Sequence, residues 1–141
     1  MKYALIGITA EELSYSMNRI QISPNTRIEL KPQFARQIRA AQENPNMYFL
    51  NLEVKIESTE QEPKPFNLKC RLVGAFQVED LETDEDRQIL AVSMTEVVYP
   101  YLRSAVSTLT ATAFINPVIL PVVPASTMFP PDYPGVDAPL S

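Results

Sequence analysis

The chain has 141 residues, of which 45% are hydrophobic and 21% are charged, and its formal net charge is −5. This length suits one ordinary domain, and the composition is typical of a folded globular protein. The acidic balance argues against a nucleic-acid partner, because binding to phosphate backbones needs clustered Lys and Arg. Histidine is absent and the three glycines lie far apart, which excludes histidine-based catalytic sites, histidine–zinc sites and phosphate-cradling loops. We expect a protein that is not an enzyme and needs no cofactor or metal.

The sequence carries no clear targeting signal. Residues 1–6 hold one cation and a short apolar stretch that is broken by Gly7, whereas a signal peptide needs an apolar region of about 7–15 residues. No later stretch reaches the roughly 20 unbroken apolar residues of a membrane span. The lone cysteine, Cys70, cannot form an internal disulfide, which agrees with a reducing compartment. We expect a cytoplasmic protein without membrane insertion.

The first part of the chain predicts strands separated by turns. Residues 13–22 begin by alternating apolar and polar side chains, which is typical of a half-buried strand, and the proline-containing residues 23–25 predict a turn. Residues 28–41 are ambiguous, because their beginning alternates like a strand whereas Phe34 and Ile38 lie four apart, as on a helix. We expect a strand end followed by irregular or briefly helical chain.

The clearest strands form a hairpin in the middle of the chain. The run from residue 47 to 59 alternates strictly, and a polar, proline-containing loop separates it from a second alternating run at 66–78. The apolar row of the first strand comprises Tyr48, Leu50, Leu52, Val54 and Ile56. One face of this hairpin should therefore pack on a core.

A long helix is predicted after the acidic connector at residues 79–86. Thr83 or Asp84 can cap it, and it should run to about Ala113, with a kink at Pro100. It carries two adjoining apolar stripes, which are Leu90, Met94, Val97 and Tyr101, and Val98, Leu102, Val106 and Leu109. This surface is too wide for one-sided packing on a small sheet. The helix is therefore either enclosed within the domain or in contact with another subunit through its second stripe.

The chain after the helix changes in character. Residues 115–129 are mostly apolar but are interrupted by Pro117, Pro121 and Pro124, which prevent a regular helix or central strand and keep the backbone extended. We expect an apolar loop there. From Pro130 the sequence is rich in proline, so we expect a domain at 1–129 and a flexible tail at 130–141.

The order of these parts resembles the SecB family of export chaperones. The strand FNLKCRLVGAF is similar to the family's third strand, which ends in a Gly-apolar-Phe signature. The helix carries an aromatic-Pro-Tyr-x-Arg segment like that of the family, and an apolar Leu-Pro-Val loop follows it. The matching residues are Gly74, Ala75, Phe76, Tyr99, Pro100, Tyr101, Arg103, Leu120, Pro121, Val122, Met128 and Phe129. The resemblance implies an α+β fold, in which a long proline-kinked helix packs on an antiparallel four-stranded sheet and subunits associate through helices and sheet edges.

The same resemblance implies a function. SecB-like proteins are ATP-independent holdases that form homotetramers, bind unfolded polypeptides and can deliver preproteins to the translocase ATPase SecA. Acidic residues on the sheet of the family dock SecA, but Lys69 stands at one such position with the opposite charge, which argues against docking. The alternative is a SecB-like chaperone or adaptor for a dedicated partner such as an antitoxin.

Two sets of candidate site residues follow. The predicted polypeptide-binding residues are Tyr48, Leu50, Ile115, Val118, Ile119, Leu120, Val122, Val123, Met128 and Phe129. The predicted oligomer interface is the second helix stripe, Val98, Leu102, Val106 and Leu109. Both sets also suit packing within a single chain, since apolar loops and stripes often cover their own core.

Overall fold

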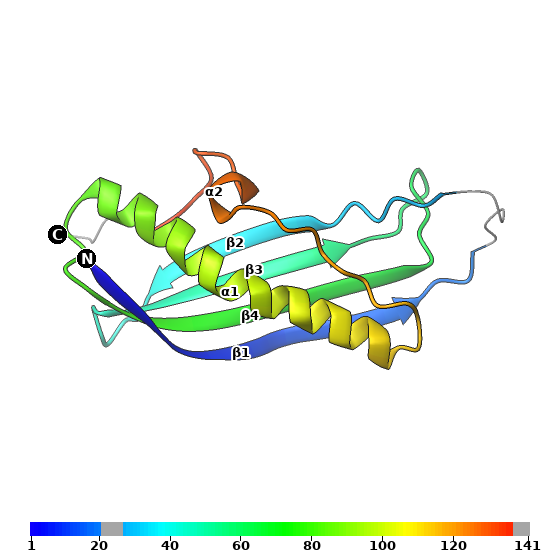
Figure 1. The fold of residues 1–141 in the computed structure, drawn as a ribbon, viewed down its shortest axis with the longest axis horizontal. Coiled ribbons are helices and arrows are strands. Elements are labelled where there is room, and N and C mark those ends of the chain that lie inside the picture. The colour runs from blue at the N-terminus through cyan, green and yellow to red at the C-terminus, as the bar shows by residue number, and fades with distance from the viewer. Residues whose placement is uncertain (21–26, 137–141) are drawn as a thin grey trace.

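The computed structural model describes residues 1–20 and 27–136, which form an antiparallel sheet crossed on one face by a long helix (Figure 1). The elements are β1 (Lys2–Met17), β2 (Gln33–Ala40), β3 (Met47–Ile56), β4 (Phe66–Glu79), α1 (Asp84–Thr112) and α2 (Ala125–Met128). The strand order is β1-β4-β3-β2, so the predicted hairpin of β3 and β4 forms the centre of the sheet. The predicted α+β class, the four antiparallel strands and the packed helix are confirmed.

The strands at the two edges differ from the sequence-based prediction. β1 begins at Lys2, whereas the sequence predicts a strand only from residue 13. The pairing of β1 with β4 shifts between Leu5 and Gly7 and again between Ala10 and Glu12. Such bulges add a residue and break the alternation of side chains. The ambiguous segment at residues 28–41 forms β2. Its sequence did not decide between strand and helix, because residues four apart share one face of either element. The turn expected at 23–25 lies outside the described residues.

The core lies between α1 and the inner face of the sheet. Inward side chains of β3 and β4 are almost all buried, and α1 contributes a stripe with a spacing of four residues: Leu90, Met94, Val98, Leu102 and Val106. The predicted helix start is confirmed, because the Thr83 side chain accepts a hydrogen bond from the Asp86 N–H at 3.0 Å. This capping bond fixes where α1 leaves the connector and begins to cross the sheet.

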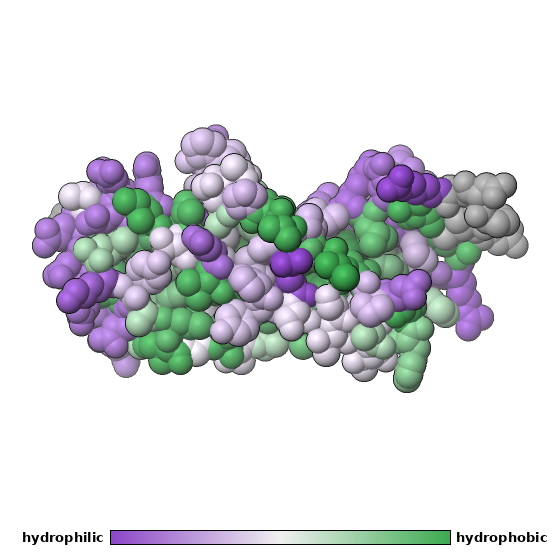
Figure 2. All heavy atoms as spheres, in the orientation of Figure 1, coloured by the Kyte–Doolittle hydropathy of each residue, from purple (hydrophilic) through white to green (hydrophobic). Residues whose placement is uncertain are grey.

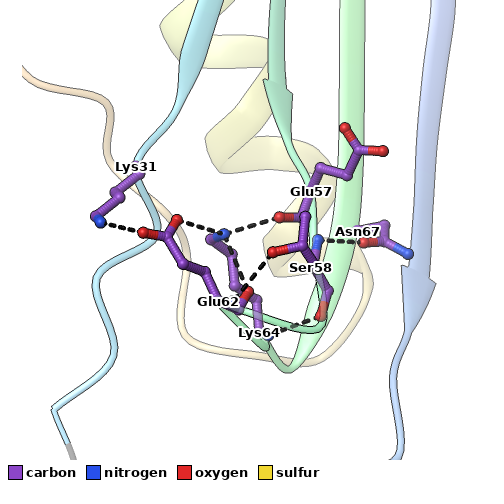
Figure 3. Close-up of polar contacts among 7 residues, drawn as sticks. Lys31, Glu57, Ser58, Glu62, Lys64 and Asn67 are labelled. Atoms are coloured by element: carbon purple, nitrogen blue, oxygen red, sulfur yellow. Dashed lines mark hydrogen bonds and ion pairs between the residues drawn. The ribbon is translucent and has the colours of Figure 1, made fainter.

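The hairpin loop between β3 and β4 is held by a buried lysine (Figure 3). Lys64 Nζ donates to the carbonyl oxygens of Glu57 and Glu62 at 2.7 and 3.4 Å. Lys31, which precedes β2, pairs with the Glu62 carboxylate. Figure 3 shows how these contacts tie the segment leading into β2 to the far end of the hairpin.

α1 approaches the sheet closely at Gly74. A Cβ atom at this position would lie 2.8 Å from Val98 Cγ2 and 3.0 Å from Phe76 Cε2. We predict that Gly74→Ala lowers the free energy of unfolding by about 1–3 kcal/mol, because both neighbours are buried and cannot move away freely. Gly7→Ala is the matched control, since nothing lies within 4 Å of its added Cβ. Urea unfolding of the two variants checks this, and equal midpoints would contradict it.

Candidate polypeptide-binding surface

The segment after α1 runs back along the helix toward α2 (Figure 1). Four polar side chains spaced about one turn apart on α1 hold its backbone, and we call them the clamp: Tyr99, Arg103, Ser107 and Thr110. The first three donate to the carbonyl oxygens of Pro121, Leu120 and Val118 at 2.6, 3.1 and 3.0 Å, respectively. Thr110 Oγ1 accepts from the Val118 N–H at 2.9 Å. The clamp therefore fixes an extended backbone.

Along the clamped backbone, some side chains are buried in the core and others are exposed to solvent. Leu120 is only 1% exposed and joins the core, whereas Ile119 is 73% and Val122 is 82% exposed. Pro121 and Pro124 reinforce this arrangement, because proline cannot continue a helix and restricts the residue before it to extended conformations. The result is an ordered segment that holds apolar side chains in solvent.

A third exposed apolar side chain lies at the end of α1. Phe114 is 96% exposed and has a φ of 63°, and its N–H donates to the Ala111 carbonyl at 3.0 Å. Glycine is the usual residue at such a left-handed helix end, and other residues pay roughly 1–2 kcal/mol there. Phe114 adds nothing to the core in return. Phe114 is not among the predicted polypeptide-binding residues, because it falls between the predicted helix, which ends at about Ala113, and the predicted loop at 115–129. Its position before an Asn-Pro break was the available signal.

The predicted polypeptide-binding residues fall into three groups. Ile119 and Val122 are exposed. Leu50, Leu120 and Phe129 are buried in the core of the single chain. The remaining five are partly buried against that core: Tyr48, Ile115, Val118, Val123 and Met128. The structure therefore brings the loop residues together along α1.

A hollow of about 440 Å³ lies between the outer face of α1 and the clamped segment. Pro100 and Tyr99 line it from the helix, and Val122 and Val123 line it from the segment. Its volume lies within the range of about 300–1,000 Å³ that is common for ligand sites. Figure 2 shows that hydrophobic residues form separate patches on this face of the molecule, with polar residues between them. Such a surface can accept single apolar side chains of an extended chain.

The predicted interface stripe lies inside one subunit. These residues belong to α1. Val98, Leu102 and Val106 are fully buried in the core of their own chain, and Leu109 is partly buried against the same core. They are therefore not exposed to a second copy. α1 instead exposes Ile89 and Tyr101.

Further exposed apolar side chains lie along β1, and we call this surface the β1 edge: Tyr3, Ile6, Leu13 and Met17. Within residues 1–20 and 27–136, no strand pairs with the outer side of β1. Leu13 and Met17 lie opposite Cys70 and Phe66, so they occupy the inner face of the sheet, yet they are 49% and 62% exposed. A single α1 does not cover this rim of the sheet.

On the open face of the sheet, Lys69 lies among charged side chains. The Lys69 ammonium lies 3.5 Å from a carboxylate oxygen of Glu12 and 3.5 Å from one of Glu53. This charge therefore lies between two acidic side chains, one on each neighbouring strand.

Among the residues that the structure describes, no helix is long and apolar enough to cross a membrane. The same residues contain no cluster of three acidic, cysteine or histidine side chains suited to a metal ion.

The only cysteine does not belong to this surface. Cys70 points into the core from β4, and burial raises the pKa of its thiol to about 11. We predict slow alkylation of the folded protein at pH 8, where only about one thiol in a thousand is ionised. The unfolded chain, with a thiol pKa near its ordinary value of 9.0, should react much faster. Mass spectrometry with and without urea measures this, and equal rates would contradict it.

The raised pKa of Cys70 also sets a pH dependence of stability. Between pH 9 and about 11 the unfolded chain loses the thiol proton while the folded chain keeps it. The contribution of this group is therefore complete below pH 9 and is lost as the pH rises. Burial likewise raises the pKa of Tyr99, whose hydroxyl donates to the Pro121 carbonyl at 2.6 Å.

The comparison with known families decides the identity. The family model of SecB, the preprotein translocase subunit SecB, matches residues 10–132. The chain belongs to the SecB family. The matched range includes the clamp, Ile119, Val122 and the part of β1 that carries Leu13 and Met17.

Several SecB proteins are similar in sequence over most of the chain. The protein-export protein SecB of Anaplasma marginale strain Florida is 25% identical over 136 residues, which cover 96% of this chain and 73% of the relative. That of Anaplasma phagocytophilum is 22% identical over 130 residues and covers 90% and 77%, respectively. An uncharacterized protein of Methanocaldococcus jannaschii is 26% identical over 119 residues, which are 84% of this chain and 76% of that protein.

A solved structure supports the fold independently. The SecB-like chaperone of Mycobacterium tuberculosis, in complex with a ChAD peptide from an antitoxin, has a TM-score of 0.68 and 15% identity to this chain. The superposition covers 86% of this chain and 90% of that chain. At this identity the likeness concerns the fold, which agrees with the four-stranded sheet and long helix described above.

Proposed function

We propose that this SecB-family chain is a non-enzymatic, ATP-independent holdase that binds unfolded polypeptides. The observation that carries the proposal is the clamp, which holds an extended segment whose Ile119 and Val122 side chains remain in solvent. A loop that served only to cover the core would turn these apolar groups inward. Four ordered side-chain bonds to a backbone that displays apolar groups suit a contact surface for other chains.

The physical properties of this surface suit clients of varied sequence. Apolar contacts are not directional, so they do not require a particular order of side chains in the client. Three prolines and the clamp already hold the segment extended, which reduces the conformational entropy lost on binding. Each contact of this kind is weak, so useful affinity needs several copies that act on one client.

An oligomer would supply those copies, and we propose a cytoplasmic homotetramer built as a dimer of dimers. The β1 edge supports one contact, because it combines a strand without an outer partner with apolar side chains on the rim of the core face. The apolar side chains that α1 exposes, Ile89 and Tyr101, support the other. The proposed contacts thus use a sheet edge and a helix, while the buried stripe of α1 stays within each subunit.

Two kinds of partner remain to be distinguished for this holdase. Delivery of preproteins to SecA is one, and service to a dedicated partner such as an antitoxin is the other. The charge of Lys69, set between Glu12 and Glu53 on the open face of the sheet, favours the second. The Mycobacterium tuberculosis chaperone of similar fold, which binds an antitoxin peptide, provides a precedent.

The test combines an assay of holding with variants of the exposed residues. The purified protein should suppress aggregation of an unrelated, chemically unfolded polypeptide without nucleotide and in the presence of EDTA. Ile119→Ser with Val122→Ser should weaken suppression, whereas Ile119→Leu with Val122→Ile should retain it, because these replacements stay apolar. A protein that binds one partner but no unrelated unfolded chain would be an adaptor rather than a holdase.

A further inference from the structure

The chain beyond α2 packs back onto the domain, and we call residues 129–136 the C-terminal strap. The rings of Phe129 and Tyr133 stack with centroids 4.5 Å apart. The Arg36 guanidinium of β2 lies over both rings, at 4.6 and 5.5 Å from their centroids. Packing onto the domain therefore continues beyond residue 129, although the sequence predicts a flexible tail from Pro130.

The strap covers the outer edge of β2, which is the second edge of the sheet. The backbone N–H of Arg36 donates to Tyr133 Oη at 3.1 Å. The guanidinium of Arg36 donates to the Pro134 carbonyl at 3.4 Å and to Thr95 Oγ1 on α1 at 3.2 Å. One arginine thus connects the sheet edge, the helix and the strap.

The strap does not fill the space in which it lies. A hollow of about 560 Å³ remains between the strap and the first turns of α1, bordered by Arg36, Ala91 and Tyr133. The backbone N–H of Arg36 donates to the Tyr133 hydroxyl and not to the backbone of a neighbouring strand. The unfilled space beside the strap leaves part of it without packing, and such a segment can open at less than the free energy of global unfolding.

We propose that the C-terminal strap is a built-in competitor for clients, occupying a second polypeptide-binding groove between β2 and α1. This inference rests on the proposed holdase function. The occupant defines the ligand, which is an extended segment with two aromatic residues four positions apart and prolines between them. The Arg36 guanidinium receives both rings and a backbone carbonyl of such a segment, and its backbone N–H is free to bond the client once the strap leaves.

An intramolecular competitor lowers the apparent affinity of the groove for clients, because only the fraction of molecules with an open groove can bind them. A tethered segment acts at an effective concentration in the millimolar range, so even weak contacts keep it in place without a client. A client that exceeds this competition opens the groove. The strap would therefore close this groove while no client is present and select for clients with aromatic side chains.

The structure offers a reversible lock for the full-length protein. A Cβ built at Gly135 lies 3.4 Å from the Cβ of Ala91, close to the spacing of about 3.5–4.5 Å in disulfides. Ala91→Cys with Gly135→Cys should therefore crosslink the strap to α1, while Cys70 stays buried. The probe is a labelled peptide with the sequence of residues 126–136. Oxidation should weaken its binding about tenfold, and reduction should restore it.

A second variant opens the groove instead of closing it. Tyr133→Ala removes a stacked ring and the acceptor of the Arg36 N–H, so the same peptide should bind this full-length variant more tightly than wild type. Asp132→Ala, an exposed neighbour, is the control. A copy of the peptide with alanine at its tyrosine should bind more weakly to every form.

The outcomes separate this inference from the proposed function. Equal peptide affinity of the oxidised and reduced lock, or weaker binding by Tyr133→Ala, would show that the strap is ordinary packing. If the wild type suppresses aggregation under those conditions, only the strap inference fails. If peptide binding follows the lock but no form suppresses aggregation, the groove stands and the holdase proposal fails.

Discussion

Serine in place of Leu120 should destabilise the fold strongly, although Leu120 belongs to the same loop as the exposed residues. Its side chain is almost fully buried, and its carbonyl accepts from Arg103 Nε. Removal of a large buried apolar group costs about 2–5 kcal/mol, and a small domain has only about 5–15 kcal/mol of stability. Thermal melting and urea unfolding of Leu120→Ser should both shift far below those of the wild type.

Serine in place of Ile119, one residue earlier, should have the opposite profile. Because this side chain is mostly in solvent, its loss should change the free energy of unfolding by no more than about 0.5 kcal/mol. Affinity for an unfolded polypeptide should fall, and the double variant with Val122→Ser should lose more. Melts and binding are measured on the same samples. Normal client affinity in the double variant would refute the proposed surface.

The second large effect concerns assembly, where Leu13→Glu should convert the proposed oligomer to smaller species. Leu13 lies on the inner face of β1 at the rim of the sheet, beyond the cover of α1. If a second subunit covers it, a carboxylate there must lose its water without a partner, which costs several kcal/mol. Size-exclusion chromatography with light scattering would show the change in mass, and circular dichroism should show an intact fold.

Leu102→Glu provides the contrast for this experiment. Leu102 is fully buried between α1 and the sheet of its own chain, so a carboxylate there should unfold the subunit rather than release it. A folded monomer from Leu102→Glu, together with an unchanged oligomer from Leu13→Glu, would place the interface on the helix stripe instead of the β1 edge.

The sequence by itself determined the elements whose local pattern allows one interpretation. The hairpin of β3 and β4 follows from strict alternation, because a half-buried strand repeats every two residues. The start of α1 follows from the capping residues Thr83 and Asp84 ahead of the acidic first turn, and the structure selects Thr83 as the cap. The ordered motifs around Gly74 and Pro100 also sufficed to indicate the SecB family, which the family match over residues 10–132 confirms.

Only the tertiary structure decided which apolar side chains are buried. Because of the bulges in β1, alternation did not reveal residues 2–12 of that strand, and a spacing of four residues could not separate strand from helix in β2. Ile119 and Leu120 are both apolar neighbours in one loop, yet the clamp turns one outward and the other inward. Burial depends on which surfaces meet when distant segments pack, and hydrophobicity along the chain does not encode that choice.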